Sequence, residues 1–406
     1  MRRVIIAGLA VLAAVLGSAS APVNAATAAT GSPALRVGSA AGTTLLALNG
    51  VSCVSDKFCA AVGAQGPVAG ASQGYVPLAM IWNGKRWLKS AARLLAHASQ
   101  GELDSVSCTS AAYCVAVGDA PGGTGSGLLA ETWNGRTWTP VTLPAGGPAA
   151  GGLTVSCGAA RSCAAVGFYA VPGGPEPFLE TLSGTKWTVR VVPATFVAFG
   201  AISCVSASHC VLGGTYVAPP NPLVNFKVDF ESWNGEAFTK MKAASAGEFV
   251  SAINGLSCAT AKACAAIGTV NAPASQPYAQ SFAVGSWNGR IWSVASVAGP
   301  KGYQNQLNDL SCTPNARCVA VGVSSTDGKQ DTSHALAVSY DGRSWTTTRV
   351  PALRNGGSSA LNGVSCVSAA WCAAVGEGGG PDGQLLSGAA LTAFWNGKTW
   401  RLVTAP

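Results

Sequence analysis

The stretch VSCVSDKFCAAVG, residues 51–63, gives the pattern on which the whole chain is built. It consists of an apolar residue, Ser, Cys, five residues, a second Cys and then Ala-Val-Gly or a close variant. The pattern occurs seven times, with its cysteines at Cys53/Cys59, Cys108/Cys114, Cys157/Cys163, Cys204/Cys210, Cys258/Cys264, Cys312/Cys318 and Cys366/Cys372. The first cysteines lie 47 to 55 residues apart, a period typical of propeller blades and other repeat arrays.

A second signature follows each cysteine pair: two large side chains five positions apart, usually around Asn-Gly. These pairs are Trp82/Trp87, Trp133/Trp138, Leu182/Trp187, Trp233/Phe238, Trp287/Trp292, Tyr340/Trp345 and Trp395/Trp400. Asn-Gly predicts a β-hairpin, because both residues tolerate positive φ. Such a row of rings suits either carbohydrate stacking or packing between neighbouring sheets. Its recurrence in every repeat favours packing.

Each repeat divides into four β-like pieces, which in the first repeat are residues 48–53, 59–62, 78–82 and 87 onward. Seven such repeats predict an all-β fold, a seven-bladed β-propeller with four antiparallel strands and one local disulfide per blade. The expected blades span about 45–95, 96–146, 147–194, 195–245, 246–299, 300–354 and 355–406. The seventh repeat contains all four strands, so no N-terminal strand is required to close the ring, although residues 35–37 are a candidate for one.

The N-terminus predicts export. Residues 1–25 have two arginines, an apolar run and an A-x-A-like site, as a signal peptide does. Residues 26–44 are a Ser/Ala/Thr/Gly-rich lead-in that we expect to be flexible, and 45–406 form one domain. In an oxidising compartment, seven identically spaced cysteine pairs favour disulfides. The three histidines lie outside these pairs, so we expect no metal site.

Composition limits the partners. The chain has 25 basic and 17 acidic residues, a formal net charge of +8, without a Lys/Arg stripe. This favours an ordinary solvated surface over nucleic-acid binding. No segment after the signal is long and apolar enough for a membrane span. No dinucleotide or phosphate fingerprint is present, so we expect no cofactor. We expect a secreted monomer.

Strand direction alternates within a blade, so the loops fall on two rims of the ring. The cysteine loops and Asn-Gly hairpins share one rim and are nearly constant; the other connections form a variable rim, where recognition is expected. The binding candidates on the variable rim are Asn49, Asp104, Asp119, Tyr169, Tyr216, Tyr278, Asn308 and Glu377. Asp119 and Glu377 occupy equivalent positions, as do Asn49, Asp104, Asn254, Asn308 and Asn362. The latter set predicts either a polar ring at the channel mouth or an Asx-type turn that starts the strand.

The segment Ser339-Tyr340-Asp341-Gly342-Arg343-Ser344-Trp345 resembles a shortened Asp-box, the hairpin repeat of sialidase-like propellers. The full pattern, with its W-N-G-x-x-W hairpins, is similar to secreted seven-repeat proteins of actinobacteria. Sialidase chemistry, as this resemblance implies it, needs three arginines and a Tyr–Glu pair. Arg86, Arg136, Arg290 and Arg343 lie in hairpins on the constant rim, so no triad is assigned.

Three functions follow as hypotheses. The first is a secreted, non-catalytic binding propeller for a glycan, a cell-envelope component or an extracellular protein. The second is a sialidase-like glycoside hydrolase or lyase, because two carboxylates from different blades can meet at the axis. The third is a structural or adhesion protein of the extracellular surface. No nucleophile elbow, HExxH or P-loop is present.

Overall fold

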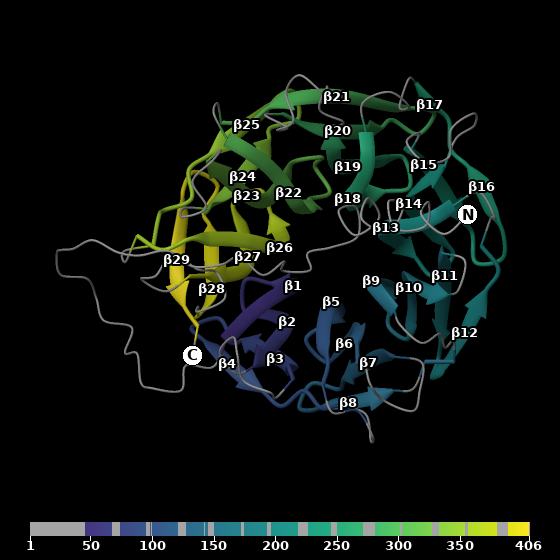
Figure 1. Cartoon of the computed structure of the whole chain (residues 1–406), viewed down its shortest axis with the longest axis horizontal. Coiled ribbons are helices and arrows are strands. Elements are labelled where there is room, and N and C mark those ends of the chain that lie inside the picture. Colours follow the sequence, from purple (N-terminus) through teal and green to yellow (C-terminus); the bar gives the residue numbers. More distant parts are fainter. Residues whose placement is uncertain are drawn as a thin grey trace, which may run out of the picture.

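Seven sheets, each with four antiparallel strands, surround a central channel (Figure 1). The computed structural model describes residues 45–66, 74–94, 98, 100–120, 127–141, 143–144, 150–171, 174–192, 196–217, 226–244, 250–270, 281–300, 303–326, 333–353, 356–379 and 389–405. The expected signal peptide, lead-in and optional strand at 35–37 lie outside the described residues, as does Tyr278.

The blades follow one another in sequence. Blade 1 contains β1 (Leu45–Ser55), β2 (Phe58–Gly66), β3 (Val76–Trp82) and β4 (Trp87–Ser90). Blade 2 contains β5 (Glu102–Ser110), β6 (Tyr113–Asp119), β7 (Leu128–Trp133) and β8 (Trp138–Val141). Blade 3 contains β9 (Ala150–Ala159), β10 (Ser162–Val171), β11 (Gly174–Ser183) and β12 (Lys186–Arg190). Blade 4 contains β13 (Phe196–Ser206), β14 (His209–Val217), β15 (Phe226–Trp233) and β16 (Phe238–Lys240).

Blade 5 contains β18 (Val250–Thr260), β19 (Ala263–Val270), β20 (Ser281–Trp287) and β21 (Trp292–Ala298), and β17 (Ala243–Ala244) adds a short parallel strand at its outer edge. Blade 6 contains β22 (Tyr303–Cys312), β23 (Cys318–Thr326), β24 (Ser333–Tyr340) and β25 (Trp345–Thr348). Blade 7 contains β26 (Ser359–Ser368), β27 (Trp371–Gly378), β28 (Ala389–Trp395) and β29 (Trp400–Thr404). The seven-bladed prediction is confirmed, with β17 as an unpredicted addition.

The first strand of each blade lies at the channel (Figure 1). All seven predicted disulfides form, with Cα–Cα separations of 3.9 to 4.0 Å. They are Cys53–Cys59, Cys108–Cys114, Cys157–Cys163, Cys204–Cys210, Cys258–Cys264, Cys312–Cys318 and Cys366–Cys372. The two cysteines of a blade are direct cross-strand partners, so the strand register itself brings them together. The bridge therefore secures each blade without linking it to another.

The disulfides lie deeper than predicted, because the cysteine loops were expected to lie on a rim. The second cysteine of every pair is buried in one of the clusters between blades: Cys59, Cys114, Cys163, Cys210, Cys264, Cys318 and Cys372. It lies in the second strand, which has a strand on each side and a neighbouring blade packed against it. These cysteines are therefore core residues as well as bridge partners, and only the turn between the two cysteines reaches the rim.

A second, unpredicted ring of contacts links the blades. The Ser of each Ser-Cys motif accepts a hydrogen bond from the backbone N–H of the Cys in the next blade, at 2.8 to 3.0 Å at all seven seams. The bond from Cys53 to Ser365 joins blade 1 to blade 7 across 312 residues of sequence. Within the described residues, the ring thus closes between two blades that are each built from one continuous part of the chain.

The hydrophobic core is divided among the seams. Seven clusters of buried residues are present, and each draws on two neighbouring blades. The hairpin rings belong to these clusters: Trp87, Trp138 and Trp292 are buried, and the six all-aromatic pairs have centroids 4.8 to 5.9 Å apart. This confirms that the rings pack neighbouring blades.

The Asn-Gly hairpins form, but for a different reason from the predicted one. Gly84 has a φ of 87°, whereas Asn83 does not have positive φ. Instead, the Asn83 side-chain oxygen accepts the backbone N–H groups of Lys85 and Arg86, each at 3.0 Å. The loop therefore needs Gly for its backbone angle and Asn (or Asp341 in blade 6) for its side-chain acceptor.

Candidate functional site

The innermost strands carry a bulge toward the variable rim, and the predicted polar position is the bulged residue. In β1 the register shifts between Leu48 and Gly50, so Asn49 is the extra residue. Opposite the bulge, a Cβ on Gly63 would clash with the Ala47 carbonyl oxygen, which explains the glycine of the Ala-Val-Gly motif. The bulged residue lies inside the strand and does not start it, so the Asx-turn interpretation does not describe its geometry.

Most of these bulged residues link one blade to the next. The amide of Asn49 donates to the Leu103 carbonyl at 3.1 Å, and Asn308 donates to the Leu361 carbonyl at 2.9 Å. Asn254 and Asn362 make the corresponding bonds at 2.8 and 3.1 Å. The Asn side chains therefore have a structural role at the seams. Whether they also bind a ligand stays a prediction.

Asp104 is the exception in this set, because a carboxylate stands where four other blades have Asn. It lies beside Glu102 and Asp119, which are direct cross-strand partners. Burial, followed by the charges of Glu102 and Asp119, raises the pKa of Asp104 well above its ordinary value, against a backbone hydrogen bond with Leu153. Blade 2 thus places three half-buried acidic groups at the channel mouth, which we call the mouth cluster.

The other members of the mouth cluster are shifted in the same direction. Burial and then the Glu102 charge raise the pKa of Asp119 to about 7. Burial raises the pKa of Glu102, against a hydrogen bond with the Asn49 side chain. Asn49, Glu102, Asp104 and Asp119 are therefore brought together from blades 1 and 2. Sequence spacing did not reveal this grouping, and Glu102 was not among the candidates, because Glu102 and Asp119 meet only through the register of β5 and β6.

Glu377 does not join the mouth cluster. It lies in β27, where Ala373 and Val375, on its face of the strand, pack against blade 1. The corresponding residues before Asp119, Val115 and Val117, pack against blade 3. Equivalent repeat positions therefore point the two carboxyl groups into different seams. Burial raises the pKa of Glu377.

The tyrosine candidates are separated as well. The Tyr169 hydroxyl donates to Glu180 at 3.5 Å, and its ring stacks on Phe178 with centroids 4.6 Å apart. Tyr216 lies in the next blade, where the Lys240 ammonium is 5.6 Å from its ring centre and pairs with Asp229. Tyr169 also packs against the apolar cluster between blades 2 and 3, and neither tyrosine contacts the mouth cluster through a described interaction.

Three buried glutamates escaped the sequence reasoning. Glu131, Glu180 and Glu231 occupy the same position in blades 2, 3 and 4, two residues before the first large side chain of the hairpin, and are 0%, 0% and 7% exposed. Burial raises the pKa of Glu131 to about 7, although the Arg93 backbone N–H donates to it at 2.7 Å. An acidic residue two positions before the hairpin ring was the signal available in the sequence.

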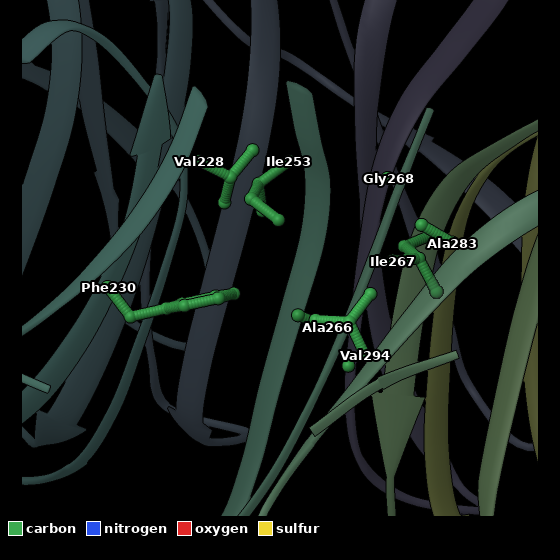
Figure 2. Close-up of a pocket in the computed structure, with 9 residues that line it drawn as sticks. Val228, Phe230, Ile253, Ala266, Ile267, Gly268, Ala283 and Val294 are labelled. Carbon is green, nitrogen blue, oxygen red and sulfur yellow. The ribbon is translucent and has the colours of Figure 1, made fainter. Parts of the chain in front are cut away.

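One cavity lies between blades 4 and 5, lined by apolar side chains such as Val228, Phe230 and Ile253 (Figure 2). Gly285 lines this cavity at the position where blades 2 to 4 have the buried glutamates. Because glycine has no side chain, the space stays unfilled. Its volume is about 10 Å³, close to the minimum for one water molecule. It is a packing defect and not a ligand site.

A larger hollow opens at the seam between blades 7 and 1, with a volume of about 390 Å³. Its lining comes from the hairpin rim of both blades: Asp56, Trp82, Gly84, Trp371, Phe394, Trp395, Asn396, Thr399 and Arg401. We call it the seam groove. It lies on the rim opposite to the one predicted to carry recognition, where the first and second strands and the third and fourth strands are joined.

The fold just described is shared with known propellers. No known protein-family profile matches the sequence, and no curated protein sequence does. The β-propeller domain of the Trilobed protease from Pyrococcus furiosus, described as having an open velcro topology, has 10% identity and a TM-score of 0.53, over 88% of this chain and 98% of that one. The chain is a β-propeller.

Two further solved structures are similar to this propeller. The acylaminoacyl peptidase of Pyrococcus horikoshii has 11% identity and a TM-score of 0.53, over 88% of this chain and 52% of that one. A structure of YCF48 bound to a D1 peptide has 14% identity and a TM-score of 0.47, over 77% and 82%. At identities this low, the likeness to the two Pyrococcus proteins establishes the propeller architecture and nothing about activity.

The described residues limit the chemistry of the site. Within them, no group of three or more His, Cys, Asp or Glu is placed to hold a metal ion. Nor does the described part of the chain contain a helix long and apolar enough to cross a membrane. The mouth cluster offers carboxyl groups that accept hydrogen bonds when ionised and, with their pKa values raised, also donate them when protonated.

Proposed function

We propose that this propeller is a secreted, non-catalytic binding protein that recognises a glycan, a cell-envelope component or an extracellular protein through its variable rim. Seven disulfides in local hairpins suit an oxidising compartment. The seven seams, each with its own apolar cluster and serine bond, make a rigid frame on which loops of variable length are displayed.

The observation that carries the proposal is the mouth cluster. Like charges opposite one another on a sheet destabilise it, and the pKa values of Glu102, Asp104 and Asp119 are all raised by burial. In the described part of the chain the one ion pair is Lys240 with Asp229, so no described cation forms an ion pair with this cluster. Neighbouring titratable groups whose pKa values are shifted by burial and by one another cluster at functional sites, which supports a binding role for this cluster. The matching ligand presents hydroxyl or cationic groups.

The test is binding of the mature chain, residues 26–406, to a glycan array, with a variant carrying Glu102→Gln and Asp119→Asn. We expect the variant to lose bound glycans, because its amides change the charge and the hydrogen-bonding pattern of the mouth. The matched control is Asp341→Asn, on the opposite rim, which should bind as the wild type does. Equal binding of neutral and cationic glycans by all three proteins contradicts the variable-rim assignment.

The hydrolase hypothesis keeps one supporting observation. A carboxyl group with a pKa of about 7, as for Asp119, is suited to general acid–base catalysis near neutral pH. A panel of fluorogenic glycosides tests it on the same proteins. Turnover that disappears in the Asp119→Asn variant identifies a glycoside hydrolase and replaces the binding-protein proposal.

A further inference from the structure

The rim opposite the variable loops gathers nearly all the excess positive charge of the molecule. We call it the hairpin face; it consists of the loops between first and second strands and the hairpins between third and fourth strands. Six hairpins contribute exposed cations there, namely Lys85, Arg136, Lys186, Arg290, Arg343 and Lys398. The blades stand side by side around the ring (Figure 1), so the six hairpins follow the ring with one gap at blade 4, whose hairpin carries Glu236.

The adjoining loops strengthen the same charge. Lys57, Arg161, Lys262 and Arg317 are exposed between first and second strands, and Arg86 accompanies Lys85. The acidic residues of the face are Asp56, Glu236 and Asp341. Eleven cations against three anions leave an excess of eight, as large as the net charge of +8 for the whole chain. Within the described residues, no carboxylate forms an ion pair with any of these cations.

The seam groove opens on this face and breaks the repeat. Phe394 stands where the other blades have Ile, Thr or Ser, and Trp371 stands where they have Phe, Tyr, Ser, His, Ala or Arg. The Phe394 ring lies 4.6 Å from that of Trp82 and 5.2 Å from that of Trp371, centre to centre. The closing seam therefore joins aromatic rings from both of its blades, beside polar Asn396 and cationic Arg401.

We propose that the hairpin face binds an acidic polysaccharide, with one sugar ring in the seam groove and further carboxylates on the hairpin cations. At about 390 Å³, the groove is in the size range of small-molecule sites. The C–H face of a sugar ring carries a slight positive charge and suits the negative face of an aromatic ring, while Arg401 suits a carboxylate on that sugar.

The arrangement of the cations favours a polymer. Cations in six of the seven hairpins match a ligand that repeats its charge along a chain, and the summed field attracts it before contact. This site is separate from the mouth cluster and extends beyond the function proposed above. An acidic protein or a nucleic acid would meet the same charge, so both belong in the test.

The first experiment measures binding of polygalacturonate, a linear uronic-acid polymer, by residues 26–406 with the disulfides intact. Neutral dextran, polyglutamate and single-stranded poly(dT) serve as comparison polymers. We expect polygalacturonate to bind at about 0.1 M salt and to weaken strongly at about 1 M, as the Debye length falls from about 10 to about 3 Å. Dextran binding as tightly, or poly(dT) or polyglutamate binding in place of polygalacturonate, overturns the proposal.

The second experiment locates the site. A triple variant with Arg136→Gln, Arg290→Gln and Lys398→Gln should bind polygalacturonate about tenfold more weakly, about 1.4 kcal/mol. The control triple, Lys227→Gln, Lys242→Gln and Arg349→Gln, changes the net charge equally but lies off the hairpin face. Equal weakening by both triples would show a response to net charge alone and would contradict a defined face.

The groove is tested separately. Trp371→Ala should weaken polygalacturonate binding about tenfold, while Tyr113→Ala, at the same repeat position in blade 2, should leave it unchanged. Should Trp371→Ala fail to fold, Arg401→Gln at the groove wall gives the same comparison. Unchanged binding by the groove variant that folds removes the groove from the site. The mouth variants Glu102→Gln and Asp119→Asn should retain polygalacturonate binding, so the two proposals succeed or fail independently.

Discussion

At the scale of single residues, the repeat is explained by what each position does to its neighbours. The serine before the first cysteine accepts a backbone N–H from the next blade, the bulged Asn donates across the same seam, and the motif glycine leaves room for the bulge. The sequence reveals these residues as a pattern. Their partners, such as those 53 and 55 residues away in blade 7, become visible only in the ring.

Ser311→Ala tests the serine ring. Its loss leaves the part-buried Cys366 N–H without its 2.9 Å partner, so we expect the free energy of unfolding to fall by about 1–3 kcal/mol. Urea denaturation followed by tryptophan fluorescence measures this. Ser339→Ala, in the same blade but at a half-exposed site whose hydroxyl meets Thr346, is the control. Equal stability of the two variants would contradict a structural role for the ring.

At the scale of elements, the disulfide hairpin is the unit that the sequence predicts best. Cysteines six positions apart across a tight turn meet as direct strand partners. The expected strands 48–53 and 59–62 were too short, because ladder pairing continues to Leu45 and Gly66. The alternation of apolar and polar residues weakens at these strand ends, whereas the backbone pairing between the two strands continues.

Replacing Cys258 and Cys264 with Ala should lower the melting temperature and preserve the fold. In the chain-entropy account, a loop with a separation of six residues contributes about 2.4 kcal/mol by restricting the unfolded chain. Differential scanning calorimetry in oxidised buffer measures the change, and circular dichroism monitors the retained sheet. An unchanged melting temperature would show that the bridge does not stabilise the blade.

At the scale of the whole molecule, folding divides charge between two faces. Cations from six of the seven repeats gather on the hairpin face, while Glu102, Asp104 and Asp119 meet at the mouth. The cations of the hairpin face do not appear as a Lys/Arg stripe in the sequence, because each contributing hairpin adds only one or two of them. The mouth cluster is not visible in the sequence either, because Glu102 and Asp119 approach each other only through the strand register.

Stability should fall as pH rises from about 4 to about 7. The pKa values of Asp119, Glu131 and Asp309 are raised to about 7, above their unfolded values of about 4. Between those values the folded chain binds more protons than the unfolded one, so the free energy of unfolding decreases from pH about 4 to about 7 and then levels off.

Melting temperatures at pH about 5 and about 7.5, on either side of the folded pKa, test this. Wild type should melt lower at the higher pH, and Glu131→Gln, which keeps an acceptor for the Arg93 N–H but cannot ionise, should lose less. A melting temperature that rises with pH, or the same loss in the variant, contradicts the raised pKa of Glu131.

The sequence by itself determined the number of blades, the disulfide pairing and the hairpin packing, because all three depend on short-range spacing repeated seven times. The tertiary structure alone decided how the ring closes, how deeply the second cysteines are buried, which carboxyl groups meet, where the charge gathers and which seam is hollow. Those features depend on contacts between blades, and a repeat period states how far apart two residues are in the chain without stating which of them face each other.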